Sequence, residues 1–189
     1  MISSSFTPNS YASAIDANAF NTLCFNPLFL RIVLNNSEIS TEVVPTIKAA
    51  GLDFFFLDTE HSVANYRDIQ NLVRAAKAMD ITAIVRVTQT EGHLISRALD
   101  CGAMGIVAPR IHSVEQAKKV IENIKFPPLG IRGYGLRSII HDYNFSGAAT
   151  EMQSSNDETL TVLQMESKEC VEAIYDITAV PGVDATMVG

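Results

Sequence analysis

Short apolar runs recur along the chain, and amphipathic segments separate them. The apolar runs have the length of β-strands and cover residues 28–34, 54–57, 83–87, 106–108, 160–165 and 183–188. Between them, apolar residues recur at helical spacing, as at Ile69, Leu72, Val73 and Ala76. The pattern predicts strands that alternate with helices, each helix having one buried face.

The strand runs are apolar throughout instead of alternating with polar residues, which indicates a parallel sheet covered on both faces. Turn and cap signals agree with this α/β prediction. Ser113 and Gln116 have the spacing of a capping box at a helix start, and Gly51 follows the predicted end of another helix. A doubly wound sheet and a barrel both fit the alternation.

Residues 129–143 are rich in glycine and polar residues, and we expect a short fifth strand near residues 130–133. With that strand the count is seven, one fewer than in a closed (β/α)8 barrel. Gly130, Gly133 and Gly135 do not have the GxGxxG order of a nucleotide-binding loop. Tight turns or close backbone approach are the better interpretation of these glycines.

Composition narrows the possible partners. The 189 residues carry a net charge of -7 without a basic run, which disfavours nucleic acid as a partner. Residues 1–25 lack the basic and apolar regions of a signal peptide or membrane span, so they are predicted to form a polar extension before a domain at 26–189. Cys24, Cys101 and Cys170 have no CxxC spacing, which favours a cytoplasmic protein without disulfides or zinc.

Ionisable residues gather where the predicted strands end. Asp58, Glu60 and His61 follow one strand, Arg86 lies inside the next, and Glu166 ends the sixth. Taken singly, Arg86 and Glu166 could form a structural ion pair, and His61 could be a hydrogen-bonded loop residue. Taken together, a carboxylate for a hard cation, a histidine base and an arginine for an anion are the parts that metal-assisted enolisation needs.

The run AGLDFFFLDTEH at 50–61 resembles the signature of the HpcH/HpaI aldolase and citrate lyase family. Further blocks in the same order match at 85–87, 97–103, 127–133, 163–167 and 181–184. The resemblance implies a (β/α)8 TIM barrel of the phosphoenolpyruvate/pyruvate type, of which this chain would hold about seven of eight strands.

The resemblance also implies catalytic roles. His61 matches the family's catalytic base, and Asp100 matches the acid that raises the basicity of that histidine. Arg86 matches the arginine that stabilises the enolate and contacts the substrate. The implied reaction is the reversible cleavage of a 4-hydroxy-2-oxo acid to pyruvate and an aldehyde.

Binding roles follow from the same resemblance. Gln164 and Gly189 are expected to contact the substrate, and Asp58 and Glu60 to support the network. Glu166 is expected to bind a divalent cation, either Mg, Mn or Co. The partners implied are a small 2-oxo acid and an aldehyde. The complete protein is expected to form a homo-oligomer, and no membrane is expected as a partner.

The lysines independently disfavour a Schiff-base mechanism, because none lies in an apolar strand where burial would lower its pKa. In the family pattern, Gly189 is followed by Pro-x-Asp-Leu-Ser, whose aspartate is the second metal ligand. We therefore expect a fragment of an active aldolase. Two alternatives stay open: a carbon-carbon bond-forming enzyme that decarboxylates oxaloacetate, and a truncated, non-catalytic relative that only oligomerises.

Overall fold

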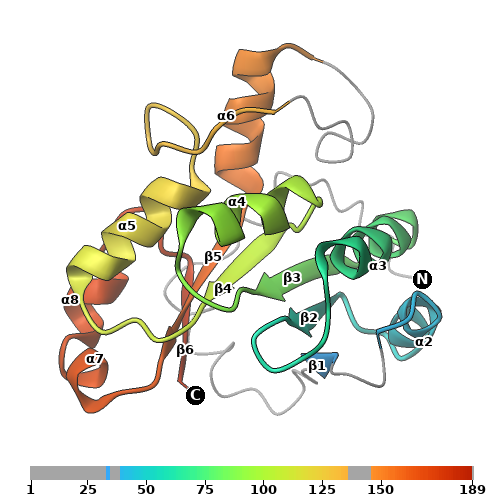
Figure 1. The fold of residues 1–189 in the computed structure, drawn as a ribbon, viewed down its shortest axis with the longest axis horizontal. Helices are drawn as coiled ribbons and strands as arrows, with labels where there is room; N and C mark the ends of the chain where they lie inside the picture. The colour runs from blue at the N-terminus through green and yellow to red at the C-terminus, as the bar shows by residue number, and fades with distance from the viewer. Residues whose placement is uncertain (1–32, 35–38, 136–145, 189) are drawn as a thin grey trace, which may run out of the picture.

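Six parallel strands form one sheet in the computed structural model, which describes residues 33–34, 39–135 and 146–188. The strands are β1 (Val33–Leu34), β2 (Phe54–Asp58), β3 (Thr82–Arg86), β4 (Gly105–Ala108), β5 (Leu160–Met165) and β6 (Ala185–Val188). They are arranged side by side in sequence order (Figure 1). This confirms the parallel α/β prediction, whereas the predicted extension at 1–25 lies outside the described residues.

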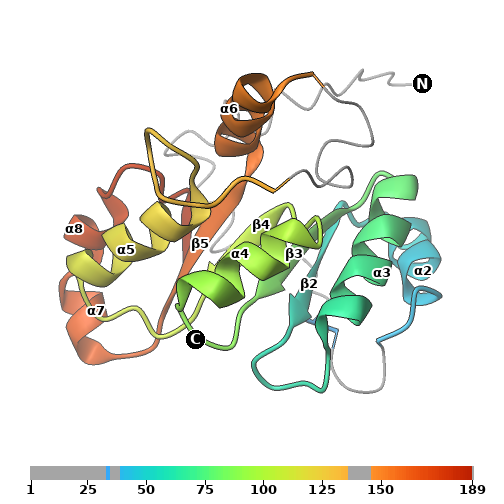
Figure 2. The same ribbon diagram turned by 45° about the horizontal axis from the view of Figure 1, so that its top comes forward.

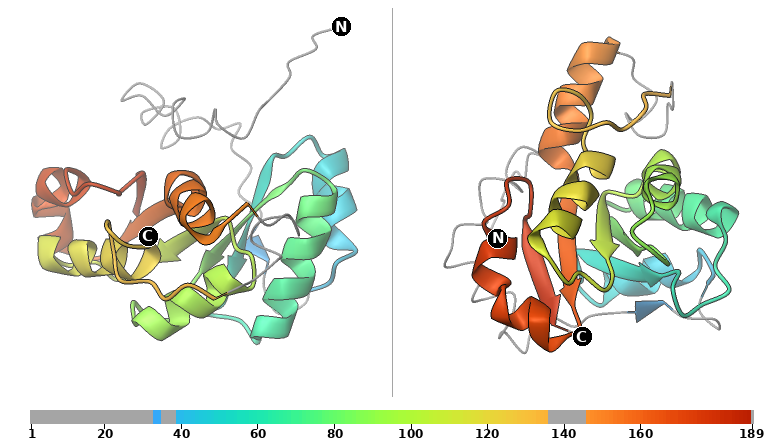
Figure 3. Two further views of the ribbon diagram at one scale, coloured as in Figure 1. Left: turned by 90° about the horizontal axis from the view of Figure 1, so that it is seen from above. Right: turned by 60° about the vertical axis from the view of Figure 1, so that its left-hand side comes forward.

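Helices connect successive strands and cover the outer side of the curved sheet, as Figures 2 and 3 show. They are α2 (Val43–Ala49), α3 (Tyr66–Ala78), α4 (Gly92–Asp100), α5 (Val114–Ile124), α6 (Ala148–Glu158), α7 (Lys168–Glu172) and α8 (Ile174–Thr178). None of the helices in the described ranges is long and apolar enough to cross a membrane. A curved parallel sheet with its helices outside is the arrangement of part of a (β/α) barrel.

Alternate strand residues pack on the two faces of the sheet. Phe55 and Leu57 of β2 are buried in the large core beneath the helices, together with Ile69 and Leu72 of α3. Phe56 belongs instead to a second cluster on the inner face, which it forms with Ile84, Val107 and flanking apolar residues. Because side chains alternate along a strand, this register determines which later residues point inward.

The prediction of a strand near residues 130–133 is wrong. These residues form no strand, and β4 pairs directly with β5, so the described residues contain six strands instead of seven. The segment folds back onto the end of α5: the N–H groups of Ile131 and Arg132 donate to the carbonyls of Glu122 and Lys125 at 2.8 and 3.1 Å. These helix-end carbonyls would otherwise be unpaired. They accept from the N–H groups that would donate to a neighbouring strand if residues 130–133 formed one.

Gly130 confirms the predicted close backbone approach. A Cβ atom at this position would lie 2.2 Å from the Lys125 carbonyl oxygen and 2.5 Å from that of Glu122. A side chain therefore has no room here. Gly133, by contrast, faces open space.

The predicted cap at Ser113 is confirmed in part. The Ser113 hydroxyl accepts from the Gln116 N–H at 3.2 Å, but the Gln116 side chain accepts from the N–H of His112 and not of Ser113. Asn65 and Asp68 form a complete capping box at the start of α3. That cap fixes where the loop after β2 ends and the helix begins.

Candidate active site

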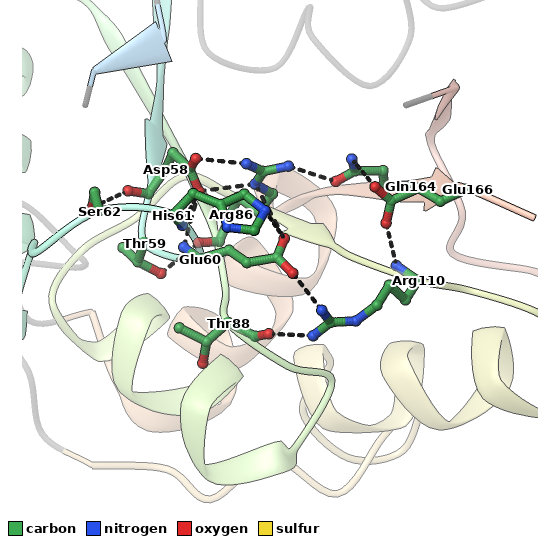
Figure 4. Close-up of polar contacts among 10 residues, drawn as sticks. All are labelled: Asp58, Thr59, Glu60, His61, Ser62, Arg86, Thr88, Arg110, Gln164 and Glu166. Atoms are coloured by element: carbon green, nitrogen blue, oxygen red, sulfur yellow. Dashed lines mark hydrogen bonds and ion pairs between the residues drawn. The ribbon is translucent and has the colours of Figure 1, made fainter. Parts of the chain in front are cut away.

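On three strands, a polar residue lies two positions after an apolar residue of the inner-face cluster. Asp58 lies two residues after Phe56 on β2, and Arg86 lies two residues after Ile84 on β3. Gln164 follows Val162 in the same way on β5. The period of two therefore directs all three side chains to the inner side, at the carboxyl ends of the strands (Figure 4).

Asp58 and Arg86 form a bidentate ion pair. Arg86 Nε donates to Asp58 Oδ1 at 2.9 Å and Nη2 donates to Oδ2 at 2.5 Å. Burial would raise the pKa of Asp58, but hydrogen bonds and charge from Arg86, with backbone N–H donors, lower it below its usual value. The Asp58 hydrogen bond raises the pKa of Arg86 despite burial, so both groups are held in their charged forms.

The loop after β2 is organised around Asp58. Its Oδ1 atom accepts from the backbone N–H groups of Glu60 and His61 at 2.9 and 3.2 Å, and its carbonyl accepts from the Ser62 hydroxyl. Thr59 binds the loop to β3, because its hydroxyl donates to the Arg86 carbonyl at 2.5 Å. The carboxylate therefore holds the segment that carries His61.

His61 lies beside the ion pair and faces solvent. Its side chain is 70% exposed, and Nε2 is 3.9 Å from Glu60 Oε2. Glu60 is nearly buried, with a side chain 7% exposed, and its Oε2 also lies 3.5 Å from Arg86 Nε. An imidazole in this position can exchange a proton with a molecule that approaches Arg86 from solvent.

Gln164 connects Arg86 with Glu166. Arg86 Nη1 donates to Gln164 Oε1 at 3.3 Å, and Gln164 Nε2 donates to Glu166 Oε1 at 3.0 Å. The direct acidic partners of Arg86 are thus Asp58 and Glu60, and the simple Arg86–Glu166 ion pair considered above is wrong. These two hydrogen bonds set the orientation of the Gln164 amide, because its oxygen must face the Arg86 donor and its nitrogen must face the Glu166 acceptor.

Arg110, which the sequence patterns did not single out, joins the same network. Its Nη1 lies 2.7 Å from Glu60 Oε1, its Nη2 donates to the Thr88 carbonyl at 2.8 Å, and its backbone N–H donates to Glu166 Oε2 at 3.2 Å. The signal was available in principle, because Arg110 follows the apolar run 106–108 at the end of a strand, as His61 and Glu166 do.

Asp100 lies away from the residues described above. It is the last residue of α4, which runs back toward the amino ends of the strands, and it accepts from Arg132 Nη2 at 3.0 Å. Arg132 is buried, packs over the Phe126 ring at 4.5 Å, and has a pKa lowered by burial. The described residues of one chain therefore do not bring Asp100 to His61. Gly189, the other predicted substrate contact, is outside the described residues.

Glu166 is the site residue suited to a divalent cation. Each carboxylate oxygen accepts one hydrogen bond, which leaves lone pairs for a metal. In the described part of the chain, no cluster of three or more His, Cys, Asp or Glu residues could hold a metal ion. Mg²⁺ commonly binds through one or two carboxylates together with water and substrate oxygens, so a single Glu166 ligand fits such an ion.

Two aldolases are among the proteins whose sequences resemble this chain. The chain is 31% identical to 2-dehydro-3,6-dideoxy-6-sulfogluconate aldolase of Pseudomonas putida over 79% of its residues, covering 58% of that protein. It is 31% identical over its whole length to 5-keto-4-deoxy-D-glucarate aldolase of Enterobacter sp. strain 638, of which it covers 69%.

The fold also matches a solved structure, the HpcH/HpaI aldolase from Desulfitobacterium hafniense DCB-2. The TM-score is 0.78 at 36% identity, covering 83% of this chain and 60% of that one. The chain thus spans between 58% and 69% of the length of these proteins. The family model for HpcH/HpaI aldolase/citrate lyase matches residues 31–189. The chain therefore belongs to the HpcH/HpaI aldolase/citrate lyase family.

Proposed function

We propose that this chain carries the site of a carbon-carbon lyase that cleaves a 4-hydroxy-2-oxo acid to pyruvate and an aldehyde through a pyruvate enolate. The observation that carries the proposal is the Arg86 guanidinium, fixed on one edge by Asp58 and bonded to Gln164 on the other. A fixed guanidinium beside an exposed histidine can stabilise an oxygen anion while a proton moves.

Arg86 supplies the anion site. Because Asp58 binds Nε and Nη2 and both groups are charged, the guanidinium is oriented before a substrate arrives. Preorganised donors need no rearrangement when negative charge develops on the enolate oxygen. Gln164 adds an amide beside Arg86 that can exchange its protein partners for substrate oxygens.

His61 is the proposed proton carrier. In the cleavage direction it takes the proton from the 4-hydroxyl group as the bond between C3 and C4 breaks, and the electron pair of that bond becomes the enolate. A proton returned to the enolate carbon then completes pyruvate. The 70% exposed side chain gives His61 access to such a substrate.

Glu166 would hold the divalent cation that aldolases of this type use. When bound, such a cation supplies a Lewis acid that draws charge from the keto oxygen of the substrate. The cation is proposed to be Mg, Mn or Co, because carboxylate oxygens suit these ions.

A coupled assay tests the proposal. Pyruvate released from several 4-hydroxy-2-oxo acids is measured through NADH oxidation by lactate dehydrogenase, with Mg²⁺, with Mn²⁺ and with chelator. Release that depends on both the metal and His61 supports the aldolase. Carbon dioxide release from oxaloacetate without cleavage of any hydroxy acid would favour the decarboxylating alternative. No turnover of either substrate class would favour the non-catalytic relative.

A further inference from the structure

Arg110 has an unfavourable backbone conformation at the edge of the candidate site. Its φ is 53°, in the left-handed region that non-glycine residues rarely adopt. The residue is not buried, since its side chain is 49% exposed, so packing alone does not account for the strain. Strained residues of this kind are concentrated at functional sites, where surrounding contacts hold them.

The contacts of Arg110 converge on two acidic residues of the site. In this conformation the backbone N–H reaches Glu166 Oε2, while the guanidinium lies 2.7 Å from Glu60 Oε1. The Thr88 carbonyl accepts from Nη2 at 2.8 Å and fixes the orientation of the Arg110 guanidinium group. Arg110 is thus oriented toward Glu60 by a second, independent hydrogen bond.

Glu60 is shared between two guanidinium groups. Its Oε1 atom has the close contact with Arg110, and its Oε2 atom lies at the longer distance of 3.5 Å from Arg86 Nε. The nearly buried Glu60 carboxylate needs a cationic partner, because burial of an unpaired charge is costly. If Arg110 were removed, Arg86 would be the nearest guanidinium left for it.

We propose that Arg110 is a positioning residue: it prevents Glu60 from approaching Arg86 more closely than the present 3.5 Å and so keeps Arg86 available to an oxygen anion. That this anion is a 2-oxo acid or its enolate rests on the proposed function. The balance of charged groups in the site points the same way. Asp58, Glu60 and Glu166 supply three carboxylates against the two guanidinium groups of Arg86 and Arg110, as the labelled side chains in Figure 4 illustrate. Loss of Arg110 would leave Arg86 as the one guanidinium beside these three carboxylates and make the site less favourable for an anion.

The conformation of Arg110 makes a clean variant possible. Glycine adopts positive φ without strain, so Arg110→Gly removes the guanidinium but keeps the backbone N–H at Glu166. Arg110→Lys keeps the charge and loses the fork, so it should recover part of the effect. Lys168→Ala is the control for loss of one positive charge, because Lys168 is an exposed residue of α7 paired with Glu172 at 3.6 Å.

Oxalate, a planar dianion with the shape of pyruvate enolate, is the probe. Its Kd is measured by calorimetry with saturating Mn²⁺ for the whole chain and for the variants. Arg110→Gly should weaken oxalate about five-fold, an effect in the range of a partly exposed ion pair. Adding Glu60→Gln to that variant should restore binding, because the carboxylate that competes for Arg86 is gone. Lys168→Ala should leave Kd unchanged.

The side-chain NMR signal of Arg86 Nε–H gives a readout that needs neither metal nor substrate. It should shift in Arg110→Gly as Glu60 moves closer, and return in the double variant. An unshifted signal would overturn the inference, and so would a shifted signal with unchanged oxalate affinity in a chain that binds oxalate. If the unaltered chain binds no oxalate but the signal shifts and returns, the proposed function fails and the role of Arg110 in positioning Glu60 stands.

Discussion

Asp58 and Arg86 are register partners on neighbouring strands, and their side chains meet through two parallel hydrogen bonds at 2.9 and 2.5 Å. Backbone pairing of β2 and β3 therefore places both ends of the ion pair. The carboxylate uses one edge of the guanidinium and leaves Nη1 directed at Gln164. Arg86 is thus a partner in a structural ion pair and also has an N–H donor that faces the candidate site.

Replacing Arg86 with lysine tests which of these roles dominates. Arg86→Lys keeps the charge near Asp58 but cannot donate to Asp58 and to an anion in the same plane. We expect pyruvate formation to fall by about 100-fold, as when one oxyanion donor is removed, with a smaller effect on unfolding. Turnover and urea unfolding are measured on the same preparation. A lower free energy of unfolding with intact turnover would assign Arg86 a structural role alone.

The Asp58 carboxyl should contribute to the acid sensitivity of the fold. Its pKa is lowered in the folded state, so its contribution to stability is present above the unfolded pKa of about 4 and is lost as pH falls through the lower folded value. Asp58→Asn should therefore flatten the pH dependence of the unfolding free energy below about pH 4. Urea titrations of both proteins across the acid range measure this slope.

Asp184 is a control, because its effect on the pH dependence of the unfolding free energy should have the opposite sign. Burial raises its pKa, although Asp184 Oδ2 accepts from the Thr161 N–H at 2.7 Å. Asp184→Asn should then gain stability relative to the unaltered chain as pH rises above about 4. Parallel slopes for Asp58→Asn and the unaltered chain would mean that the Asp58–Arg86 pair does not set the acid response.

Asp100 is expected to affect stability through Arg132. The Arg132 side chain is only 1% exposed, and Nη2 lies 3.0 Å from Oδ1 of Asp100. Asp100→Asn should destabilise the fold by about 2 to 3 kcal/mol, below the full cost of breaking a buried pair because Asp100 is partly exposed. Thermal unfolding measures the loss. Unchanged stability with lost turnover would instead support the role that the family resemblance implied for Asp100.

Gly130 and Gly133 form a matched pair for the segment that replaces the expected strand. A Cβ atom at Gly130 would collide with two backbone carbonyl oxygens, whereas nothing lies within 4 Å of one at Gly133. Gly130→Ala should cost more than about 3 kcal/mol, since backbone must move, and Gly133→Ala should lie within about 0.5 kcal/mol of the original. Equal stabilities of the two variants would rule out the close approach at Gly130.

The apolar runs predicted five of the six described strands closely, because buried parallel strands differ strongly from the amphipathic helices between them. The sixth, β1, lies at the end of a longer predicted run. The segment after α5 could not be predicted in this way, because its N–H groups pair with helix-end carbonyls, and hydropathy does not register this choice.

The site was predictable where side chains continue the period of a strand, as at Asp58, Arg86 and Gln164. Arg110 was not, since its role depends on a positive φ and on the Thr88 carbonyl, both set by the folded loop. The contact of Asp100 also needed the structure. A helix that connects parallel strands ends near their amino ends, but its last residue pairs with Arg132, which is 32 residues further along the chain.

Exchange of the pyruvate methyl protons with deuterated water is the most direct measure of enolate formation at this site, because it requires no knowledge of the aldehyde. ¹H NMR follows the loss of the methyl signal with Mg²⁺ or Mn²⁺ and with chelator. We predict exchange that requires the metal and falls by about 100-fold or more in His61→Ala, the usual size of general base catalysis. Absence of exchange in the presence of metal, or exchange at the original rate in His61→Ala, would contradict this prediction.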